Sequence, residues 1–207
     1  MNDEPTQRRA RSAGDAATRR RLLDAARAVV RTNGIVGASS RVIAAEADAN
    51  LGAITYHFGS KDSLIADALF EELERQVAPA LEALRTPGDP ATVMLGVVQQ
   101  LLEQLERSKK DSTLYLEALL LATRDPAYAK RARALYRTIR QRLADVITEM
   151  VDAGAIPSWI EADAMAALIL ATANGIVVQT LVEPRGPDQH AMAGQFAALL
   201  LAARTPE

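Results

Sequence analysis

The sequence has no cysteine and only two histidines, His57 and His190, among its 207 residues. Without cysteine there is no disulfide, no thiolate metal site and no cysteine nucleophile, and this absence is typical of a reducing interior. Two histidines leave little material for a His-rich zinc site, so we expect neither a metal nor a cofactor. Aromatic residues make up only 4% of a chain that is 49% hydrophobic. Its apolar mass therefore comes mainly from Ala, Leu, Val and Ile, which predicts a folded globular protein.

The N-terminus also lacks the apolar run of a signal peptide, because Met1–Pro5 is followed by arginines. We therefore expect a cytoplasmic protein. Residues 164–182 contain no charged side chain and come close to the roughly 20 residues that span a bilayer. Polar residues such as Asn174 and Gln179 interrupt this stretch. The better interpretation is a helix buried on several sides inside protein, with no membrane involved.

Charge is distributed unevenly, although the net charge is only −2. Residues 1–61 hold ten Lys and Arg against six Asp and Glu, whereas residues 62–207 hold fourteen against twenty. A basic N-terminal module on a mildly acidic body indicates that the first part binds a polyanion. Arg8, Arg9 and Arg11 lie in an N-terminal arm that enters a minor groove, adds non-specific attraction to phosphates or only makes the chain more soluble.

Helix start and stop signals recur along the whole sequence, and no stretch alternates apolar and polar residues as a strand does. The expected fold class is all-α, with about nine helices. They are expected over about residues 18–33, 40–47, 51–58, from 61 to near 79, and over 90–107, 112–123, 126–153, 158–182 and 188–203.

Particular residues set these boundaries. Gly34 should end the first helix, and Pro79 should end or kink the fourth. Asp125 precedes a proline and is expected to cap the helix that starts there. Ser158 with Glu161 three residues later predicts a capping box at the start of the penultimate helix.

The segment over residues 39–64 carries the most information. It reads SSRVIAAEADANLGAITYHFGSKDSL, in which two short predicted helices are separated by about three residues. This is the layout of a helix-turn-helix. A recognition helix must enter the major groove, so its outer face needs small or polar residues, here Gly52, Ala53 and Thr55.

The opposite face of the second short helix should hold it in place. Ile54 and Phe58 lie one turn apart and are expected to pack onto Val42, Ile43 and the first helix. Such a pair of apolar residues is also ordinary core packing when taken alone.

At the edge of this helix, Tyr56 and His57 are placed to meet phosphate oxygens. Lys61 would stand at the positive N-terminal end of the next helix, where a phosphate is favoured. Each of these residues alone is more often structural, and only their combination points to DNA.

The segment resembles the DNA-binding motif of the TetR family of bacterial transcriptional regulators, over about residues 18–65. The family pattern appears here as Ile43-Ala44, Ala47, Gly52, Tyr56-His57-Phe58, Ser60-Lys61-Asp62 and Leu64. Asp48 occupies the turn position where the family commonly has Gly, so either Asp tolerates a left-handed conformation or the turn differs. Asn50 is an equivalent cap at the usual Ser position, and Thr55 replaces a common aromatic residue.

The resemblance implies three parts. A flexible Arg-rich arm covers residues 1–17, a helix-turn-helix DNA-binding domain covers 18–62, and a ligand-binding and dimerisation domain covers 63–207. Residues expected to contact double-stranded operator DNA are Ser39, Ser40, Arg41, Asn50, Leu51, Gly52, Ala53, Thr55, Tyr56, His57 and Lys61.

The resemblance also implies an apolar ligand cavity in the body and a homodimer built from the last two helices. The residues support the dimer physically, because small side chains allow close helix approach and large apolar ones supply buried area. The interface candidates are Leu168, Ala171, Gly175, Ile176, Val178, Phe196, Leu199 and Leu200.

Candidate ligand contacts are flexible, aromatic or unexpectedly polar residues on apolar helix faces. They are Met94, Tyr115, Leu119, Tyr136, Leu143 and Asn174. Each of these is more often ordinary core, and Asn174 equally suits a hydrogen bond to its mate across the dimer axis.

The body contains no Gly-rich phosphate loop, no Gly-x-Ser-x-Gly elbow and no His-Glu-x-x-His motif, so we do not expect an enzyme. The expected function is a ligand-responsive, DNA-binding transcriptional regulator: a homodimeric repressor that a small apolar effector releases from a palindromic operator. The alternative is an all-α carrier of an apolar molecule that does not bind DNA. Repression and activation remain alternatives, because the direction of regulation depends on where the operator lies relative to a promoter.

Overall fold

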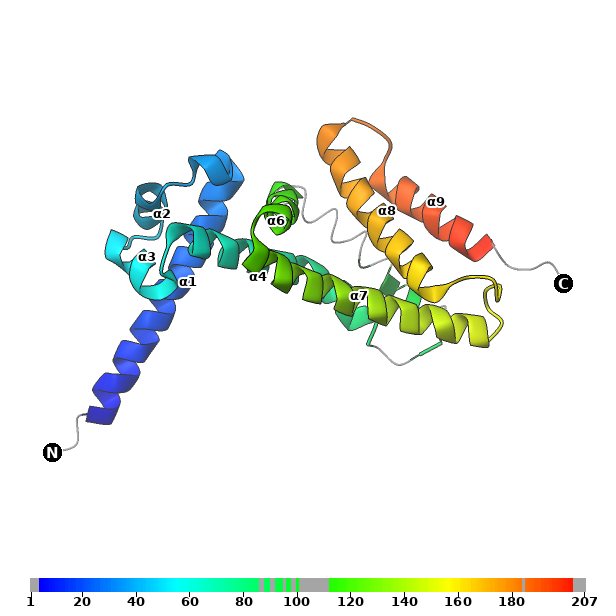
Figure 1. The fold of residues 1–207 in the computed structure, drawn as a ribbon, viewed down its shortest axis with the longest axis horizontal. Coiled ribbons are helices and arrows are strands. Elements are labelled where there is room, and N and C mark those ends of the chain that lie inside the picture. Colours follow the sequence, from blue (N-terminus) through cyan, green and yellow to red (C-terminus); the bar gives the residue numbers. More distant parts are fainter. Residues whose placement is uncertain are drawn as a thin grey trace. The chain divides into compact units, whose positions relative to one another are not determined.

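The computed structural model describes residues 4–85, 88–89, 92–94, 96–97, 100, 112–183 and 185–202 (Figure 1). Within that part the regular elements are α-helices and there is no strand, so the all-α expectation is confirmed. The chain divides into two compact units: Met1–Leu73 with Thr113–Tyr128, and Glu74–Ser112 with Ala129–Glu207. We call them unit 1 and unit 2. Of the helix expected over 90–107, residues 92–94, 96–97 and 100 are helical and the others lie outside the described residues.

Unit 1 contains α1 (Glu4–Gly37), α2 (Ser40–Glu46), α3 (Leu51–Phe58), the first part of α4 (Lys61–Ala83) and nearly all of α6 (Ser112–Arg124). Its core is formed by apolar stripes with helical spacing. On α1 this stripe includes Leu22, Ala26 and Val30, all fully buried. On α4 it includes Leu64 and Leu69, which are also fully buried. These two buried stripes form the centre of the unit 1 core.

The start of α1 differs from the sequence prediction. The helix begins at Glu4 instead of near Thr18, so the backbone of residues 4–17 is helical where a flexible arm was expected. Thr18 Oγ1 donates a hydrogen bond to the carbonyl oxygen of Gly14, 3.0 Å away, as hydroxyls do in helix interiors. Pro5 suits a first helical turn, and the Gln and Arg residues after it are good helix formers.

Two residues with positive φ shape the turns on either side of α2. Gly34 has φ 67° and ψ 174°, which interrupts α1 at the predicted stop. Asp48 has φ 47° and is the one non-glycine residue in the described ranges with a positive φ. Asp tolerates this left-handed conformation better than most residues. The first of the two alternatives for the turn is therefore confirmed.

The later helix boundaries agree with the sequence only in part. The Asp125 carboxylate accepts a hydrogen bond from the Tyr128 N–H at 2.8 Å and caps α7, as predicted. In contrast, α4 continues through Pro79 to Ala83, so the helix does not end at this proline. Apolar residues on both sides of Pro79 pack against the core of unit 2, and this packing offsets the hydrogen bond that proline cannot donate.

Unit 2 is built from the rest of α4 and from α7 (Pro126–Asp152, from Ala129 on), α8 (Ala162–Val182) and α9 (Gln189–Ala202). Its core joins Ile139, Leu143 and Ile147 of α7 to Ile169 of α8. These side chains are 2–8% exposed, so α7 and α8 are held together along this stretch by apolar burial.

The predicted capping box at the start of α8 is wrong. The N-cap residue is Glu161, whose side chain forms no capping hydrogen bond, and Ser158 lies in the turn before it. The connection from α7 is fixed by packing instead, because Ile156 and Ile160 are both buried in the unit 2 core.

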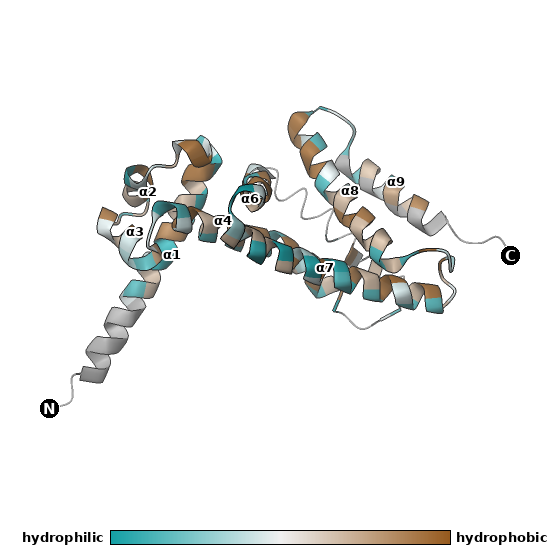
Figure 2. Cartoon of the chain, viewed as in Figure 1, coloured by the Kyte–Doolittle hydropathy of each residue, from teal (hydrophilic) through white to brown (hydrophobic). Residues whose placement is uncertain are grey.

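The helix α8 is mainly apolar (Figure 2), with a mean hydropathy of 1.8 over its most apolar stretch. In the described part of the chain it is the one helix long and apolar enough to cross a membrane, a property that core helices of other proteins share. Only 17% of that stretch is buried by the rest of the chain, so one copy does not provide the expected burial on several sides.

The left-handed turn generates a stability prediction. Asp48→Val should lower the free energy of unfolding by about 1–2 kcal/mol, because a β-branched residue is poorly tolerated at positive φ. Asp48→Gly should leave it unchanged or raise it. Asp48 is exposed, so neither change alters core packing. Urea unfolding measures the difference, with the exposed helical Glu46→Val as control, and equal losses from both valine substitutions would contradict the turn geometry.

Candidate nucleic-acid interface

Three capped helix starts fix the local geometry of α2, α3 and α4. The side chains of Ser39, Asn50 and Ser60 each accept a hydrogen bond from the backbone N–H three residues further on, at 3.3, 2.8 and 3.0 Å. These bonds satisfy donors that a helix start leaves open, and each contributes about 1 kcal/mol. The cap at Asn50 is the one that the family resemblance predicted.

The inner face of α3 is held by burial. Ile54 is 2% exposed and Ile43 of α2 is fully buried, as expected. Phe58 is only half-buried, and Val42 is 42% exposed, so the prediction that Val42 packs under α3 is wrong. The buried residues of α2 are Ile43 and Ala44, and Val42 lies to the solvent side of them.

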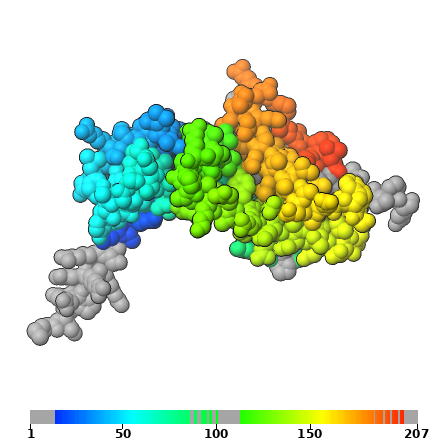
Figure 3. Space-filling model, viewed as in Figure 1, coloured from blue at the N-terminus to red at the C-terminus, as the bar shows by residue number. Residues whose placement is uncertain are grey.

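The outer face of α3 is open to solvent, and the segment near residues 50–60, cyan in Figure 3, forms part of the outer surface of unit 1. Tyr56 is 73% exposed, and its ring meets His57 edge-on with centroids 4.8 Å apart. At Gly52 a Cβ atom would come 3.3 Å from the capping oxygen of Asn50, so glycine keeps this first turn uncrowded. The surface therefore presents little bulk beyond Leu51 and Tyr56.

Unit 1 carries all of the predicted DNA-contacting residues. Exposed are Ser39, Arg41, Asn50, Leu51, Gly52, Thr55 and Tyr56, and half-buried are Ser40, Ala53, His57 and Lys61.

Lys61 is the first residue of α4. Its Nζ lies 3.2 Å from Asp62 Oδ1, and the Asp62 side chain is 85% exposed. An exposed ion pair of this kind is weak, so Lys61 can leave the Asp62 carboxylate and bind a phosphate at little cost in free energy. The positive end of the α4 dipole at the same place favours an anion.

Sequence reasoning missed the role of Arg19. Its Nη2 lies 3.3 Å from Asp67 Oδ2 on α4, and its guanidinium stands over the Phe58 ring with Cζ 5.0 Å from the centroid. Arg19 thus touches both the end of α3 and the first turns of α4, and it positions the two relative to α1. Three consecutive arginines, such as Arg19-Arg20-Arg21, are in themselves more typical of a solvated helix face.

A carboxylate of α4 also gathers two further arginines of α1. Glu71 Oε2 lies 3.4 Å from Arg20 Nη1 and 3.2 Å from Arg27 Nη1. Asp67 and Glu71 are four residues apart and share one helix face, which was the available sequence signal. These pairs hold α1 beside α4. They also neutralise arginines that the charge distribution of the sequence had suggested for binding a polyanion.

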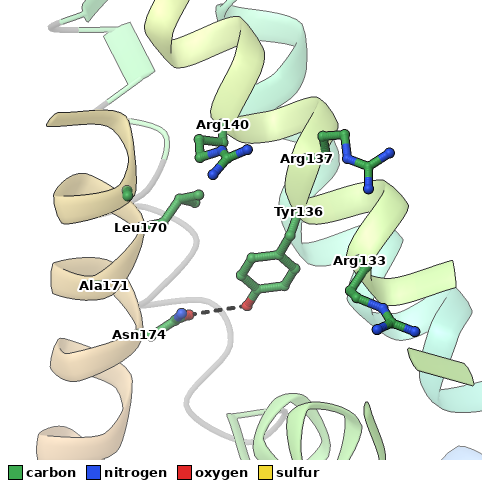
Figure 4. A pocket seen from close by; sticks show the side chains of 8 residues that line it. Arg133, Tyr136, Arg137, Arg140, Leu170, Ala171 and Asn174 are labelled. Carbon is green, nitrogen blue, oxygen red and sulfur yellow. Dashed lines mark hydrogen bonds between the residues drawn. The ribbon is translucent and has the colours of Figure 1, made fainter. Parts of the chain in front are cut away.

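Unit 2 contains a separate cavity of about 450 Å³ between α7 and α8 (Figure 4). It is lined by Arg133, Tyr136, Arg137, Arg140, Ala167, Leu170, Ala171 and Asn174. The Tyr136 hydroxyl donates a hydrogen bond to Asn174 Oδ1 at 3.4 Å across the opening.

Two of the six predicted ligand residues, Tyr136 and Asn174, line this cavity. Met94 and Leu143 are 7% and 2% exposed in the unit 2 core, and Tyr115 and Leu119 belong to unit 1. Flexible and aromatic side chains pack in a core as readily as they line a cavity. Residue type alone therefore did not distinguish core residues from cavity residues.

The predicted dimer residues also separate into groups. Leu168, Val178 and Leu199 are 57%, 41% and 63% exposed and remain available to a partner. Ile176 is 4% exposed within unit 2, and Phe196 is half-buried against its core. The side chain of Leu200 lies outside the described residues. Ala171 is exposed and Gly175 is half-buried.

Comparisons with known proteins agree with this arrangement. HdnoR of Paenarthrobacter nicotinovorans, a nicotine-responsive transcriptional repressor of the helix-turn-helix type, is 25% identical over 82% of this chain and 86% of its own length. A crystal structure of a transcriptional regulator from Rhodococcus sp. Rha1 is 29% identical, with a TM-score of 0.73 over 91% of this chain and 99% of that one. For a TetR transcription regulator from Haloarcula marismortui the identity is 22% and the TM-score 0.79, over 91% and 98%.

Family models account for both halves of the chain. Residues 22–68 match the model for bacterial regulatory proteins of the tetR family. Residues 90–203 match the model for the C-terminal part of BetI-type transcriptional repressors, which alone spans more than half of the 207 residues. The chain therefore belongs to the TetR family of bacterial transcriptional regulators.

Proposed function

We propose that the chain is a homodimeric repressor that a small-molecule effector releases from a palindromic operator in the cytoplasm. The coarser statement, a DNA-binding transcriptional regulator, follows from the family. The observation that supports the DNA-binding part of the proposal is α3, which is capped at its start, buried at Ile54 and exposed on its other face. A helix presented in this way fits the major groove.

Within α3 and at the start of α4, each side chain would have a separate task. Gly52 and Thr55 let the helix approach base edges, since they are small and exposed. Tyr56, His57 and Lys61 would donate to phosphate oxygens and set the register on the duplex. Because few side chains reach base edges, the operator sequence also depends on DNA shape.

The apolar surface of α8 supports the homodimer. Five residues on α8 follow the alternating three- and four-residue spacing of a helix-packing seam: Leu168, Ala171, Gly175, Val178 and Val182. Large apolar side chains stand at both ends, where Leu168 is 57% and Val182 is 80% exposed. The small residues in the middle would allow two copies of α8 to approach closely. A two-fold axis there would place two α3 helices on half-sites about 34–36 Å apart or a multiple of that distance.

An effector would act by changing how the two reading helices are spaced. HdnoR is nicotine-responsive by name, which supports a small-molecule response in this chain too. The single helix α4 begins at Lys61 and carries Val77 and Leu81 against the unit 2 core, so it has residues in both units. A hundredfold loss of operator affinity needs only about 2.7 kcal/mol of coupling.

A mobility shift separates this proposal from the carrier alternative. The protein should retard DNA from its own upstream region at nanomolar concentration, and the affinity should fall steeply as salt rises. A carrier would show neither effect, and that result would overturn the regulator proposal.

Lys61→Ala should weaken binding to all DNA sequences and reduce the salt slope by about one counterion, because one phosphate contact is lost. Operator and unrelated duplexes titrated at several salt concentrations measure both effects. Lys130→Ala, on an exposed position of α7, serves as control. If Lys61→Ala left the salt dependence of DNA affinity unchanged, Lys61 would not contact a phosphate.

Leu168→Glu should convert the dimer to a monomer, because each copy would bury a carboxylate without a partner in the apolar seam. Sedimentation velocity reports the change, and operator affinity should fall with it. Leu120→Glu is a matched control on α6, since Leu120 is 48% exposed in unit 1. A dimer that survives Leu168→Glu but not Leu120→Glu would place the interface elsewhere.

A further inference from the structure

The cavity in unit 2 has one strongly basic wall. Arg133, Tyr136, Arg137 and Arg140 follow the spacing of a single helix face and line it from α7 (Figure 4). The opposite wall on α8 has the same spacing and is made of Ala167, Leu170, Ala171 and Asn174. Tyr136 and Arg140 point from α7 toward this mainly apolar surface, whereas Arg133 and Arg137 are exposed and stand at the solvent edge of the cavity.

The charge of this wall is only partly compensated. Arg140 Nε lies 3.2 Å from Asp163 Oδ1 on α8. Arg133 Nε donates to the carbonyl oxygen of Ala129 in its own helix at 3.1 Å, a contact that neutralises no charge. Within the described ranges, neither Arg133 nor Arg137 forms an ion pair. Two cationic groups at the cavity therefore have no carboxylate partner in that part of the chain.

The surrounding sequence concentrates this charge further. Residues 130–142 hold six of the fourteen Lys and Arg found in residues 62–207 and no Asp or Glu. The body as a whole is acidic, with twenty Asp and Glu. The first half of α7 is thus a local exception, and a cationic ligand would be repelled there.

We propose that this cavity binds an amphipathic organic anion, a carboxylate with an apolar body. The guanidinium groups would take the carboxylate, because their donor geometry matches its two oxygens. Leu170 and the alanines of α8 would cover the apolar body, and the Tyr136–Asn174 pair would supply further polar contacts. This deepens the proposed function, on which it rests, by giving the effector a charge where the sequence had suggested a purely apolar one.

The experiment compares three molecules of equal length and different charge: octanoate, octanamide and octylammonium. Titration calorimetry on the full chain should show octanoate binding about tenfold or more tightly than octanamide, with octylammonium weakest. Arg137→Gln should remove the advantage of octanoate over octanamide. Arg142→Gln is the matched control on the same helix, outside the cavity lining and beside Asp145, and it should keep that advantage.

Equal binding of octanoate and octanamide, preference for octylammonium, or no binding of any of the three would overturn the proposal. Mobility-shift assays in the absence of octanoate test whether the arginines of the cavity wall contact DNA or a second copy instead. If Arg137→Gln alone weakens retardation of the upstream DNA, the arginines contact DNA, and if it alters the sedimentation of the protein they contact a second copy. Either result would also overturn it.

The same assays separate this inference from the regulator proposal. Wild-type protein that retards DNA but shows no octanoate preference would overturn only the acid site. Protein that binds octanoate through Arg137 but does not retard DNA would support the acid site and overturn the repressor. Octanoate should release preformed complexes of the wild type and of Arg142→Gln, but not those of Arg137→Gln.

Discussion

Packing of two very short helices onto longer ones is the constraint on which the DNA-binding part depends. The helices α2 and α3 have seven and eight residues, well below the roughly 12–15 at which an isolated helix becomes marginally stable in water. Their caps lower the cost of starting each helix but do not suffice alone. Burial of Ile43 and Ile54 in unit 1 supplies the remaining stabilisation, at roughly 1.5–3 kcal/mol for each side chain. The outer face of α3 can stay small and polar only because its inner face is held in this way.

Ion pairs between α1 and α4 change how the charge of the N-terminal part should be understood. The sequence count gave residues 1–61 a clear excess of basic residues. The structure directs Arg19, Arg20 and Arg27 to Asp67 and Glu71. The pairs of Arg19 and Arg20 are largely exposed and contribute little to stability, whereas the Arg27 side chain is only 12% exposed. Together they orient α1 on α4 and leave less positive charge for a polyanion, so DNA attraction must come from fewer cations, such as Arg41 and Lys61.

Local chemistry was predictable from the sequence because it depends on neighbours along the chain. The caps at Ser39, Asn50 and Asp125 follow from residue type and position, and the left-handed Asp48 was one of two outcomes that the motif allowed. The fold class and the helix-turn-helix followed from the same signals.

Features decided by contacts distant in sequence were less accessible. The capping box at Ser158 has the right residues, yet burial of Ile156 and Ile160 sets the start of α8 instead. Val42 is apolar but lies to the solvent side of Ile43. The sequence predicted Tyr136 and Asn174 of this cavity but missed its arginines, because arginines on a helix are ordinarily solvated. Only the facing residues of α8 reveal that Arg133, Arg137 and Arg140 line a cavity.

The two proposed roles of α8 lie on adjacent faces of one helix, and this adjacency offers a route from effector to operator. Residues 167, 170, 171 and 174 line the cavity, whereas residues 168, 171, 175, 178 and 182 form the apolar seam. Ala171 belongs to both sets. With 100° between successive residues, the two stripes lie side by side on the helix surface. A ligand that displaces the cavity-lining face of α8 would therefore also displace the seam. A molecule that enters between α7 and α8 would therefore shift the surface through which two copies pair. Since the dimer axis sets the spacing of the two α3 helices, a small change at that seam would be enough to alter operator affinity.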